Sequence, residues 1–492
     1  MQAVMGWILR DMARVGRAFL ARYYEEIALV LFCVGIALYG LGLSGFSTHF
    51  RAQGFLQIGG LLFILFAYKR FGREDLHALR VPLISFGVVI VLGLLTYFDD
   101  VMPQSFGKVW GSVNTHIIKY LVLFVVVFLY VRHTRRAYAL ILLGFFGLMC
   151  ALNVGGTLLE FWQHGFKHNA GKSNLPFYFN AIYTYNIWLI APMALCISGA
   201  VVCRHLVLKA LCALGAGLTI VAMFANGERS FLVAAFVMVF VPFFVWHYRY
   251  KARILGFVVV FALPIALSAL YVQTKSLPER YNFAHMVDNF WEVIHTPVAA
   301  MGKYDKTCFG WMQCNAQSTK DGKAKFFWEH SSLARLAMSK STFKAFLDAP
   351  FTPRLVGVFQ TGAYLWQYYE SHPHKQQNRM YVSMDNPKHN GYNSPHNFVI
   401  NLLFCYGIIG FVAILGFLGF VLYRTYWQFT HNTEDRAKAL ISLWAFVCLV
   451  GICAQSVLDV IYPNILETLF VFLGGVMGLC CMRYGSSREV VL

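Results

Sequence analysis

The sequence predicts an all-α polytopic membrane protein with about twelve transmembrane helices and one large, mostly helical loop outside the membrane. Of the 492 residues, 58% are hydrophobic and only 13% are charged, which is too little charge for the surface of a soluble protein of this length. Long apolar runs recur along the chain, each able to cross a hydrocarbon core about 30 Å thick. Because backbone amides in lipid must be hydrogen-bonded internally, these runs are expected to be helices.

The apolar runs predict twelve spans. They cover residues 25–44, 54–68, 81–98, 115–131, 137–155, 181–202, 206–225, 230–246, 254–272, 397–423, 438–458 and 463–482. Residues 1–272 are therefore expected to form a membrane domain with nine spans, residues 273–395 a large loop, and residues 396–492 three further spans with a short tail. The basic, amphipathic N-terminal segment leads directly into a full-length span, so no cleavable signal peptide is predicted.

The net charge of +18 is explained by the orientation of the spans. Alternate short loops are strongly basic, and by the positive-inside rule these loops and both termini are expected to be cytoplasmic. They are Lys69–Arg73 with Arg80, Arg132–Arg136, Arg204 with Lys209, Arg249–Arg253, and Arg424–Lys438. Because the charge is divided among loops and does not form one basic face, the sequence predicts no nucleic-acid partner. The large loop 273–395 then lies on the periplasmic side.

The large loop contains two features that suggest local order. Cys308 and Cys314 could form a disulfide in an oxidising compartment, although two unrelated thiols are the alternative. An amphipathic helix is expected after Ser331 and Ser332, ending before Pro350. The stretch 372–395 is rich in His, Pro, Asn and Gly, and is expected to be irregular.

The stretch that joins the loop to the tenth span is the most informative part of the sequence. His396 and Asn397 follow Pro395 at the outer end of the span, and Gly407 and Gly410 lie three positions apart further along it. An imidazole at this position could accept a proton near neutral pH. The two glycines would leave a flat helix face for a close neighbour. A capping histidine and an ordinary packing pair are the alternative interpretation.

The pattern His-Asn, nine residues, then Gly-x-x-Gly resembles the signature of bacterial O-antigen ligases. This family belongs to a superfamily with O-antigen polymerases and protein O-oligosaccharyltransferases. The resemblance extends to the layout of twelve spans with one large periplasmic loop before the tenth. Asn226-Gly227-Glu228-Arg229-Ser230 resembles a second family element, although Glu228 replaces a small or polar residue. Arg335, upstream of Pro350-Phe351, resembles the arginine of the family's loop helix.

The resemblance implies a glycosyltransferase of the bacterial inner membrane whose active site faces the periplasm. The implied donor is an O-antigen polysaccharide on undecaprenyl diphosphate, and the implied acceptor is a sugar hydroxyl of lipid A-core, with membrane lipids around both. Arg229, Arg335 and Arg280 would bind the diphosphate, because guanidinium groups stabilise its charge without a metal. His396 would be the general base. Asn397 and Glu160 are candidates for positioning the acceptor. No cofactor is expected, and inversion at the anomeric carbon is expected.

Each of these residues also has a simpler explanation. Arg229 could snorkel to the headgroups, Arg335 could lie on a solvated helix face, and Arg280 could pair with a nearby carboxylate. Glu160 would by default be an exposed loop residue. The loop histidines, His330, His372, His374 and His389, would be solvated. Asp99 and Asp100 at the end of the third span could instead bind Mg²⁺, although no third ligand is near in the sequence.

Three other functions remain open at this stage. An O-antigen polymerase would share the donor and the chemistry, and a protein O-oligosaccharyltransferase would transfer the glycan to Ser or Thr. The short segment after the last span, residues 483–492, favours the ligase over the protein-directed enzyme. A transporter is less favoured, because transporters usually carry ionisable residues deep in their spans, and here the charges lie mainly near the span ends.

Overall fold

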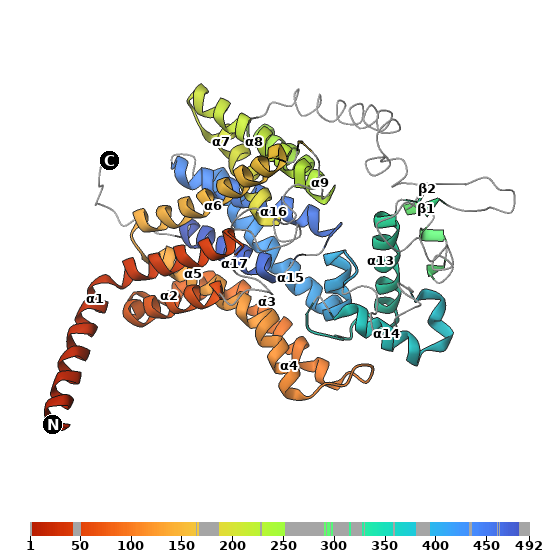
Figure 1. Ribbon diagram of the computed structural model, residues 1–492, viewed down its shortest axis with the longest axis horizontal. Helices are drawn as coiled ribbons and strands as arrows, with labels where there is room; N and C mark the ends of the chain where they lie inside the picture. Colours follow the sequence, from red (N-terminus) through yellow and green to blue (C-terminus); the bar gives the residue numbers. More distant parts are fainter. Residues whose placement is uncertain are drawn as a thin grey trace.

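The computed structural model describes most of the predicted membrane domain and part of the large loop. The described residues are 2–42, 51–163, 165–166, 186–226, 229–250, 290–291, 293–295, 297–298, 314–315, 327–328, 330–357, 360–379, 394–431, 435–459, 461 and 463–481. The predicted span 254–272 and most of the loop lie outside them. The described secondary structure is almost entirely helical, as the composition predicts (Figure 1).

The described helices are of very different length. In chain order they are α1 Gln2–Gly40, α2 Ala52–Ala67, η1 Tyr68–Arg70, α3 Arg73–Leu95, η2 Thr96–Phe98, α4 Phe106–Val113, the π-helical η3 Asn114–Ile118, α5 Lys119–His133, α6 Arg136–Gln163, α7 Asn186–Val202, α8 Leu206–Asn226, α9 Arg229–Tyr250, α13 His330–Asp348, α14 Thr361–Ser371, η7 Pro373–Asn378, α15 Phe398–His431, α16 Arg436–Ser456 and α17 Pro463–Cys480. Two short strands, β1 Cys314–Asn315 and β2 Phe327–Trp328, pair in antiparallel orientation.

The chain is a membrane protein by the length and composition of its helices. Among the described residues, seven helices are long and apolar enough to cross a bilayer: Ala52–Arg70, Arg73–Phe98, Phe106–His133, Arg136–Gln163, Leu206–Asn226, Phe398–His431 and Arg436–Ser456. Shorter apolar helices run over Ile187–Val202, Ser230–Phe240 and Ile465–Cys480. Every predicted span except 254–272 coincides with a described helix. The number of helices that actually cross the membrane stays a prediction.

The centre of the bundle is held by close packing of α5 against α17. Gly474 and Gly478 lie one turn apart on α17, and a Cβ added to either would come within 2.5 Å and 2.7 Å of the carbonyl oxygens of Phe124 and Phe128, respectively. Only glycine permits this approach of two helix backbones. A buried ion pair between Lys119 of α5 and Glu467 of α17 reinforces the same contact.

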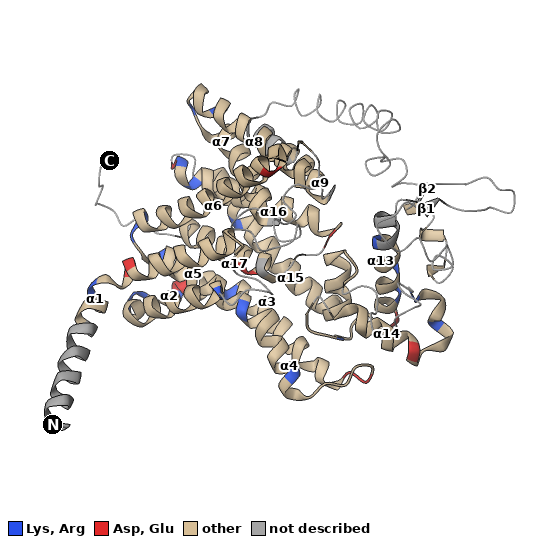
Figure 2. Cartoon of the chain, viewed as in Figure 1, with Lys and Arg blue, Asp and Glu red and all other residues tan. Residues whose placement is uncertain are grey.

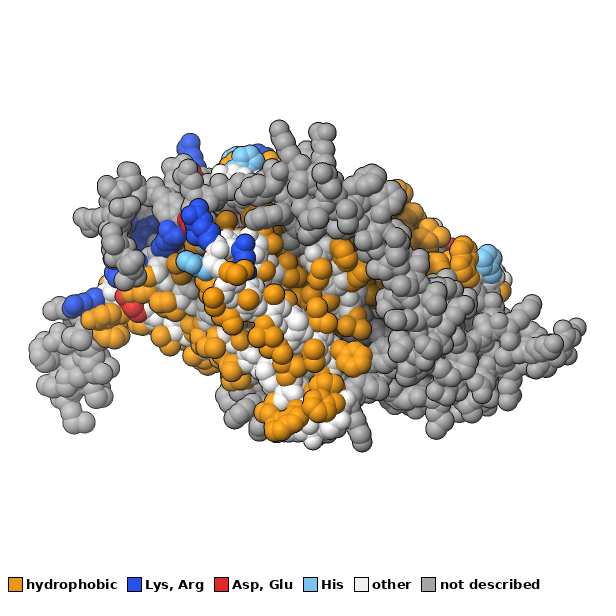
Figure 3. All heavy atoms as spheres, turned by 90° about the horizontal axis from the view of Figure 1, so that it is seen from above, with side chains coloured by type: hydrophobic (Ala, Val, Ile, Leu, Met, Phe, Trp, Pro, Cys, Tyr) orange, Lys and Arg blue, Asp and Glu red, His pale blue; other side chains and the backbone are white. Residues whose placement is uncertain are grey.

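Basic loops that lie far apart in the sequence come together at one end of the bundle. Arg132 pairs with Asp75 at 2.5 Å, and Arg136 pairs with Asp435 at 3.1 Å. These pairs join the last turn of α5 to the start of α3, and the start of α6 to the residue before α16. Figure 2 shows the charged residues along the chain, and in Figure 3 Lys, Arg and His side chains gather beside a broad apolar surface. We call the end of the bundle at which these loops meet the basic end.

Helix α15 is interrupted near its start. Gly407 adopts the left-handed conformation with φ of 66°, so the helix changes direction there. The loop after α13 provides hydrogen-bond partners at the break. The N–H of Ile408 donates to the carbonyl of Pro350, and the N–H of Arg354 donates to the carbonyl of Cys405. The two glycines do leave room for a close neighbour. They do not form one flat helix face, however, because the helix breaks at Gly407, whose backbone conformation favours glycine.

Candidate active site

His396 lies in the link that leads into α15, at the end of the bundle opposite the basic loops. Its backbone has φ of 47°, an uncommon conformation for a residue with a side chain. Two contacts hold this backbone in place. Pro395 accepts a hydrogen bond from the hydroxyl of Ser339 on α13 at 3.0 Å, and the side-chain oxygen of Asn397 accepts one from the N–H of Ile400 at 3.0 Å. Asn397 therefore caps α15, which is a positioning role.

The imidazole of His396 faces a buried carboxylate that the sequence analysis missed. Nδ1 of His396 lies 3.3 Å from Oδ1 of Asp459, which follows α16 and is only 3% exposed. The backbone carbonyl of Asp459 also accepts a hydrogen bond from the N–H of Phe398 at 3.2 Å. An ionised carboxylate can only accept hydrogen bonds, so of the two tautomers of a neutral imidazole it selects the one with the proton on Nδ1. Nε2 is then left as the proton acceptor.

The same carboxylate attracts Arg335 from the loop helix. Nη1 of Arg335 lies 4.0 Å from Oδ2 of Asp459, and the arginine side chain is 21% exposed. Arg335 is thus half-buried and does not lie on a solvated face of α13. Three segments that are distant in the sequence, α13, the start of α15 and the end of α16, converge on Asp459. We call His396, Asp459 and Arg335 the outer cluster.

The start of α9 brings the backbone of Arg229 towards this cluster. Ser230, the next residue, accepts a hydrogen bond from the side-chain amide of Gln455 at 3.3 Å. Gln455 lies one turn before Asp459 at the end of α16. The side chain of Arg229 is outside the described part, so its backbone position alone is defined. That position is at the same end of the bundle as the outer cluster.

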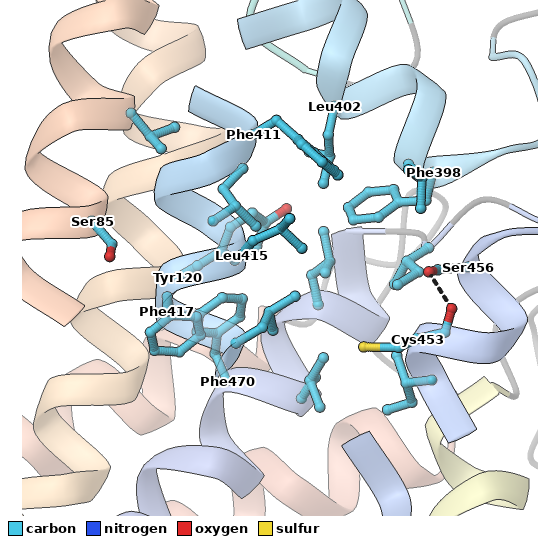
Figure 4. A pocket seen from close by; sticks show the side chains of 18 of the residues that line it. Ser85, Tyr120, Phe398, Leu402, Phe411, Leu415, Phe417, Cys453, Ser456 and Phe470 are labelled. Atoms are coloured by element: carbon cyan, nitrogen blue, oxygen red, sulfur yellow. Dashed lines mark hydrogen bonds between the residues drawn. The ribbon is translucent and has the colours of Figure 1, made fainter. Parts of the chain in front are cut away.

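An apolar cavity of about 310 Å³ begins beside the outer cluster and extends into the helix bundle. Phe398 and Val457, each two residues from a member of the cluster, line one part, and Phe417 and Phe470 line another (Figure 4). Apolar cavities of about half this volume can hold a benzene-sized molecule. The cavity could therefore accept a short stretch of hydrocarbon chain. Its wall is formed by α3, η3, α5, α15, α16 and α17, with Gly357 from the loop before α14.

Glu160 is not in the environment that the sequence predicted. It is buried, with 4% of its surface exposed, in the last turn of α6. The expectation of an exposed loop residue was wrong because α6 continues to Gln163, beyond the predicted end of the span at residue 155. Phe161 next to it packs against Ala225 of α8. Nothing in the described structure places Glu160 in the outer cluster.

Asp99 has a structural role that accounts for its position. Its carboxylate accepts hydrogen bonds from the N–H groups of Val101 and Met102, and from the hydroxyl of Tyr364 at 2.6 Å. Burial and this contact with Asp99 raise the pKa of Tyr364, so its hydroxyl stays protonated and donates. Among the described residues, no group of three His, Cys, Asp or Glu side chains could hold a metal ion.

Other predicted residues lie away from the cluster or outside the described residues. His372 stacks on Tyr368 at the end of α14, with His374 beside it. Arg280, His389 and Cys308 are not described, nor are the side chains of His330 and Cys314. The roles proposed for Arg280 and for a Cys308–Cys314 disulfide therefore stay predictions.

The chain was also compared with known proteins. Residues 214–415 match the model of a protein family described as O-antigen ligase. The match includes Arg229, Arg335, His396 and both glycines of the predicted motif, and it ends before Asp459. No curated protein matches the chain.

Proposed function

We propose, from the premise that the chain belongs to the O-antigen ligase superfamily, that it transfers an O-antigen polysaccharide from undecaprenyl diphosphate to lipid A-core. The family match by itself supports a membrane-bound glycosyltransferase of O-antigen ligase or polymerase type, without naming its donor and acceptor. The main support for the finer proposal is the outer cluster, in which a histidine, an acid and an arginine from separate segments meet beside an apolar cavity.

The position of the cluster suits a donor with a lipid carrier. It lies at the end of the bundle opposite the basic loops, and by the positive-inside rule this end faces the periplasm. The apolar cavity would hold the first part of the isoprenoid chain, and the diphosphate would lie at its mouth near Phe398 and Val457. The sugar attached to the diphosphate would then be next to His396.

The chemical step needs a base and a group that stabilises the leaving diphosphate. Nε2 of His396 takes the proton of the acceptor hydroxyl while its oxygen attacks the anomeric carbon. The bond from that carbon to the diphosphate oxygen breaks, and its electron pair leaves with the diphosphate. Asp459 keeps the imidazole in the correct tautomer and stabilises its positive charge after proton transfer. No covalent carboxylate intermediate is involved, so the anomeric configuration is inverted.

The arginines provide the charge that the leaving group requires. Arg335 would bind the diphosphate through paired N–H groups, and Arg229 would join it from the start of α9. Arg280 is a third candidate in the loop. Losing one such desolvated contact would cost about 2–4 kcal/mol of transition-state stabilisation, comparable to losing one oxyanion donor. Because guanidinium groups can neutralise the diphosphate, the proposal includes no metal.

The test is transfer in vitro with purified protein, a polyprenyl-diphosphate glycan and lipid A-core, with and without EDTA. His396→Ala is expected to reduce transfer by about 10²–10⁴-fold, with unchanged folding in detergent. His372→Ala is the matched control, because this histidine stacks on Tyr368 away from the cluster. Retained transfer by His396→Ala would refute the base. Loss of activity in EDTA would refute the metal-free step, and transfer only to a second lipid-linked glycan would indicate a polymerase.

A further inference from the structure

Helix α13, which carries Arg335, has an exposed apolar stripe on the side away from its packed face. Phe343, Leu347 and Phe351 follow at intervals of four residues and are 37%, 49% and 63% exposed. Phe343 and Leu347 are four residues apart and lie on the same face of α13, and Phe351 follows in the turn after the helix ends at Asp348. The opposite face is packed, since Met338 and Ala345 are buried. Figure 1 shows α13 outside the central bundle, next to α14.

Neighbouring residues widen this apolar surface. The ammonium group of Lys340 donates to the carbonyls of Val293 and Ile294, which holds the described residues 293–295 beside α13. Phe290, Trp291 and Ile294 on this segment are about half exposed. Burial and the nearby Lys344 lower the pKa of Lys340. Apolar side chains that are exposed together in this way mark an interaction site.

The packed face of α13 meets the ends of helices that are apolar enough to cross the membrane. Ala345 and Phe346 of α13 belong to the same buried cluster as Val109 and Val113 of α4. At this end of α3 and α4, Phe98 and Phe106 are 73% and 59% exposed. Aromatic rings at the ends of spans are typical of the membrane interface. The exposed face of α13 therefore lies close to span ends that are typical of the interface.

We propose that the stripe Phe343–Leu347–Phe351 lies in the outer leaflet of the membrane, so that α13 is an interfacial helix and not a solvated loop helix. Lys344 is exposed next to the stripe, where its ammonium group can reach anionic lipid headgroups while its stem covers apolar surface. A second copy of the chain would explain the apolar residues. Lipid is favoured as the occupant because α13 packs at the end of the bundle where the aromatic side chains of Phe98 and Phe106 are exposed.

This arrangement determines the depth of the outer cluster, and in that respect it rests on the proposed function. Arg335 precedes Phe343 by about two turns of α13, or about 12 Å along the helix axis. A helix lying in the interface would thus keep the guanidinium group at the level of the headgroups. The diphosphate of a lipid-linked donor lies at the same level.

The first experiment places a photo-crosslinking phenylalanine analogue at Phe343, Leu347 or Phe351 of the full-length protein in phosphatidylethanolamine–phosphatidylglycerol proteoliposomes. Glu370, an exposed residue on α14 whose side chain is 54% accessible, is the control position. We expect phospholipid adducts at least five-fold more abundant at the three stripe positions than at Glu370. Equal adduct levels, or covalent dimers of the chain in place of lipid adducts, would overturn the proposal.

The second experiment separates this surface from the catalytic function. The crosslinking is repeated in the His396→Ala background, where lipid adducts are expected unchanged even though transfer is lost. In the otherwise native protein, Leu347→Asp is expected to raise the KM for the lipid-linked donor about tenfold, with kcat within twofold. An unchanged KM would overturn the link between the stripe and donor binding. It would not affect the role of His396 as the base, which the His396→Ala variant tests separately.

Discussion

At the residue scale, the pairing of His396 with Asp459 gives the imidazole a defined direction. The distance of 3.3 Å is slightly longer than most N–H···O hydrogen bonds, and such contacts often tighten when substrate binds. The carboxylate is buried, so its charge acts on the ring with little screening by water. Without this partner, the imidazole could place its proton on either nitrogen and rotate about its side-chain bonds.

Asp459→Asn should therefore reduce transfer by about 10²–10⁴-fold, because an amide can stabilise the wrong tautomer and cannot offset the imidazolium charge. The measurement is kcat for polysaccharide transfer, with the thermal unfolding midpoint of each variant. Asp348→Asn is the matched control, since Asp348 pairs with Lys375 at the far end of α13. If Asp459→Asn retained full kcat, the orientation of His396 would not depend on this carboxylate.

Substitutions at Arg335 test whether the geometry of the guanidinium group matters in addition to its charge. Arg335→Ala should lower kcat/KM for the lipid-linked donor by about 10²-fold, and Arg335→Lys should lower it less, because lysine keeps the charge but loses the paired N–H groups. Arg51→Ala, an exposed arginine before α2, should leave kcat/KM unchanged. Equal activity of the Lys and Ala variants would contradict a phosphate clamp.

The sequence predicted individual residues only where a spacing pattern marked them. His396 was found because a proline precedes it and a glycine pair follows it, and Arg335 because its position upstream of Pro350 and Phe351 resembles a family element. Asp459 had no such signal, since a single aspartate after a span looks like any other interfacial carboxylate. Its role depends on the folding of α13 and α16 towards each other. Glu160 was misjudged for a related reason, because exposure depends on where the helix ends.

At the element scale, the break in α15 connects the loop that follows α13 to the helix that follows His396. Pro350 and Arg354 satisfy backbone groups that the break exposes. A Cβ added to Gly407 would lie 2.9 Å from the carbonyl oxygen of Pro350. Both the conformation of this glycine and the space around it therefore favour the absence of a side chain. The break at Gly407 therefore fixes the position of α13 relative to His396 through these backbone contacts.

Gly407→Ala should lower the free energy of unfolding by about 1–3 kcal/mol, because alanine is strained at a positive φ and meets Pro350. Thermal unfolding in detergent measures this loss. Gly419→Ala on the same helix is the control, since Gly419 has open space around it and a regular helical conformation. It should be neutral or slightly stabilising. Similar unfolding midpoints for both variants would show that the contact between α15 and the loop after α13 does not depend on Gly407.

Helix existence was easier to predict from the sequence than helix ends. The predicted third span began at residue 81, whereas α3 begins at Arg73. The charged residues before the span appeared to be loop residues, but Asp75 is buried by its pairs with Arg132 and His133. Hydropathy identifies the part of a helix that lipid surrounds. It does not detect the turns beyond the lipid, which are held by ion pairs between distant segments.

At the scale of the whole molecule, a buried polar group joins the N-terminal and C-terminal halves. Lys119 of α5 pairs with Glu467 of α17, and the hydroxyl of Tyr39 on α1 donates to the same carboxylate. The side chains of Lys119 and Glu467 are only 13% and 10% exposed. The existence of the helices could be predicted from hydropathy, but this pair could not. Each partner alone resembled an ordinary charge near the end of a span.

Glu467→Gln should lower the free energy of unfolding by about 3–5 kcal/mol, because it leaves the ammonium group of Lys119 buried without its counter-charge. The double variant Lys119→Met with Glu467→Met should recover most of that loss, since two apolar side chains remove the desolvation penalty of both charges. Tyr39→Phe removes one hydrogen bond and should cost about 1 kcal/mol. The single variants Lys119→Met and Glu467→Met complete a double-mutant cycle with the double Met variant, and thermal unfolding of all three in detergent measures the coupling. Additive losses would mean that the two side chains act independently, and that close packing of Gly474 and Gly478 against α5 is enough to hold the two halves together.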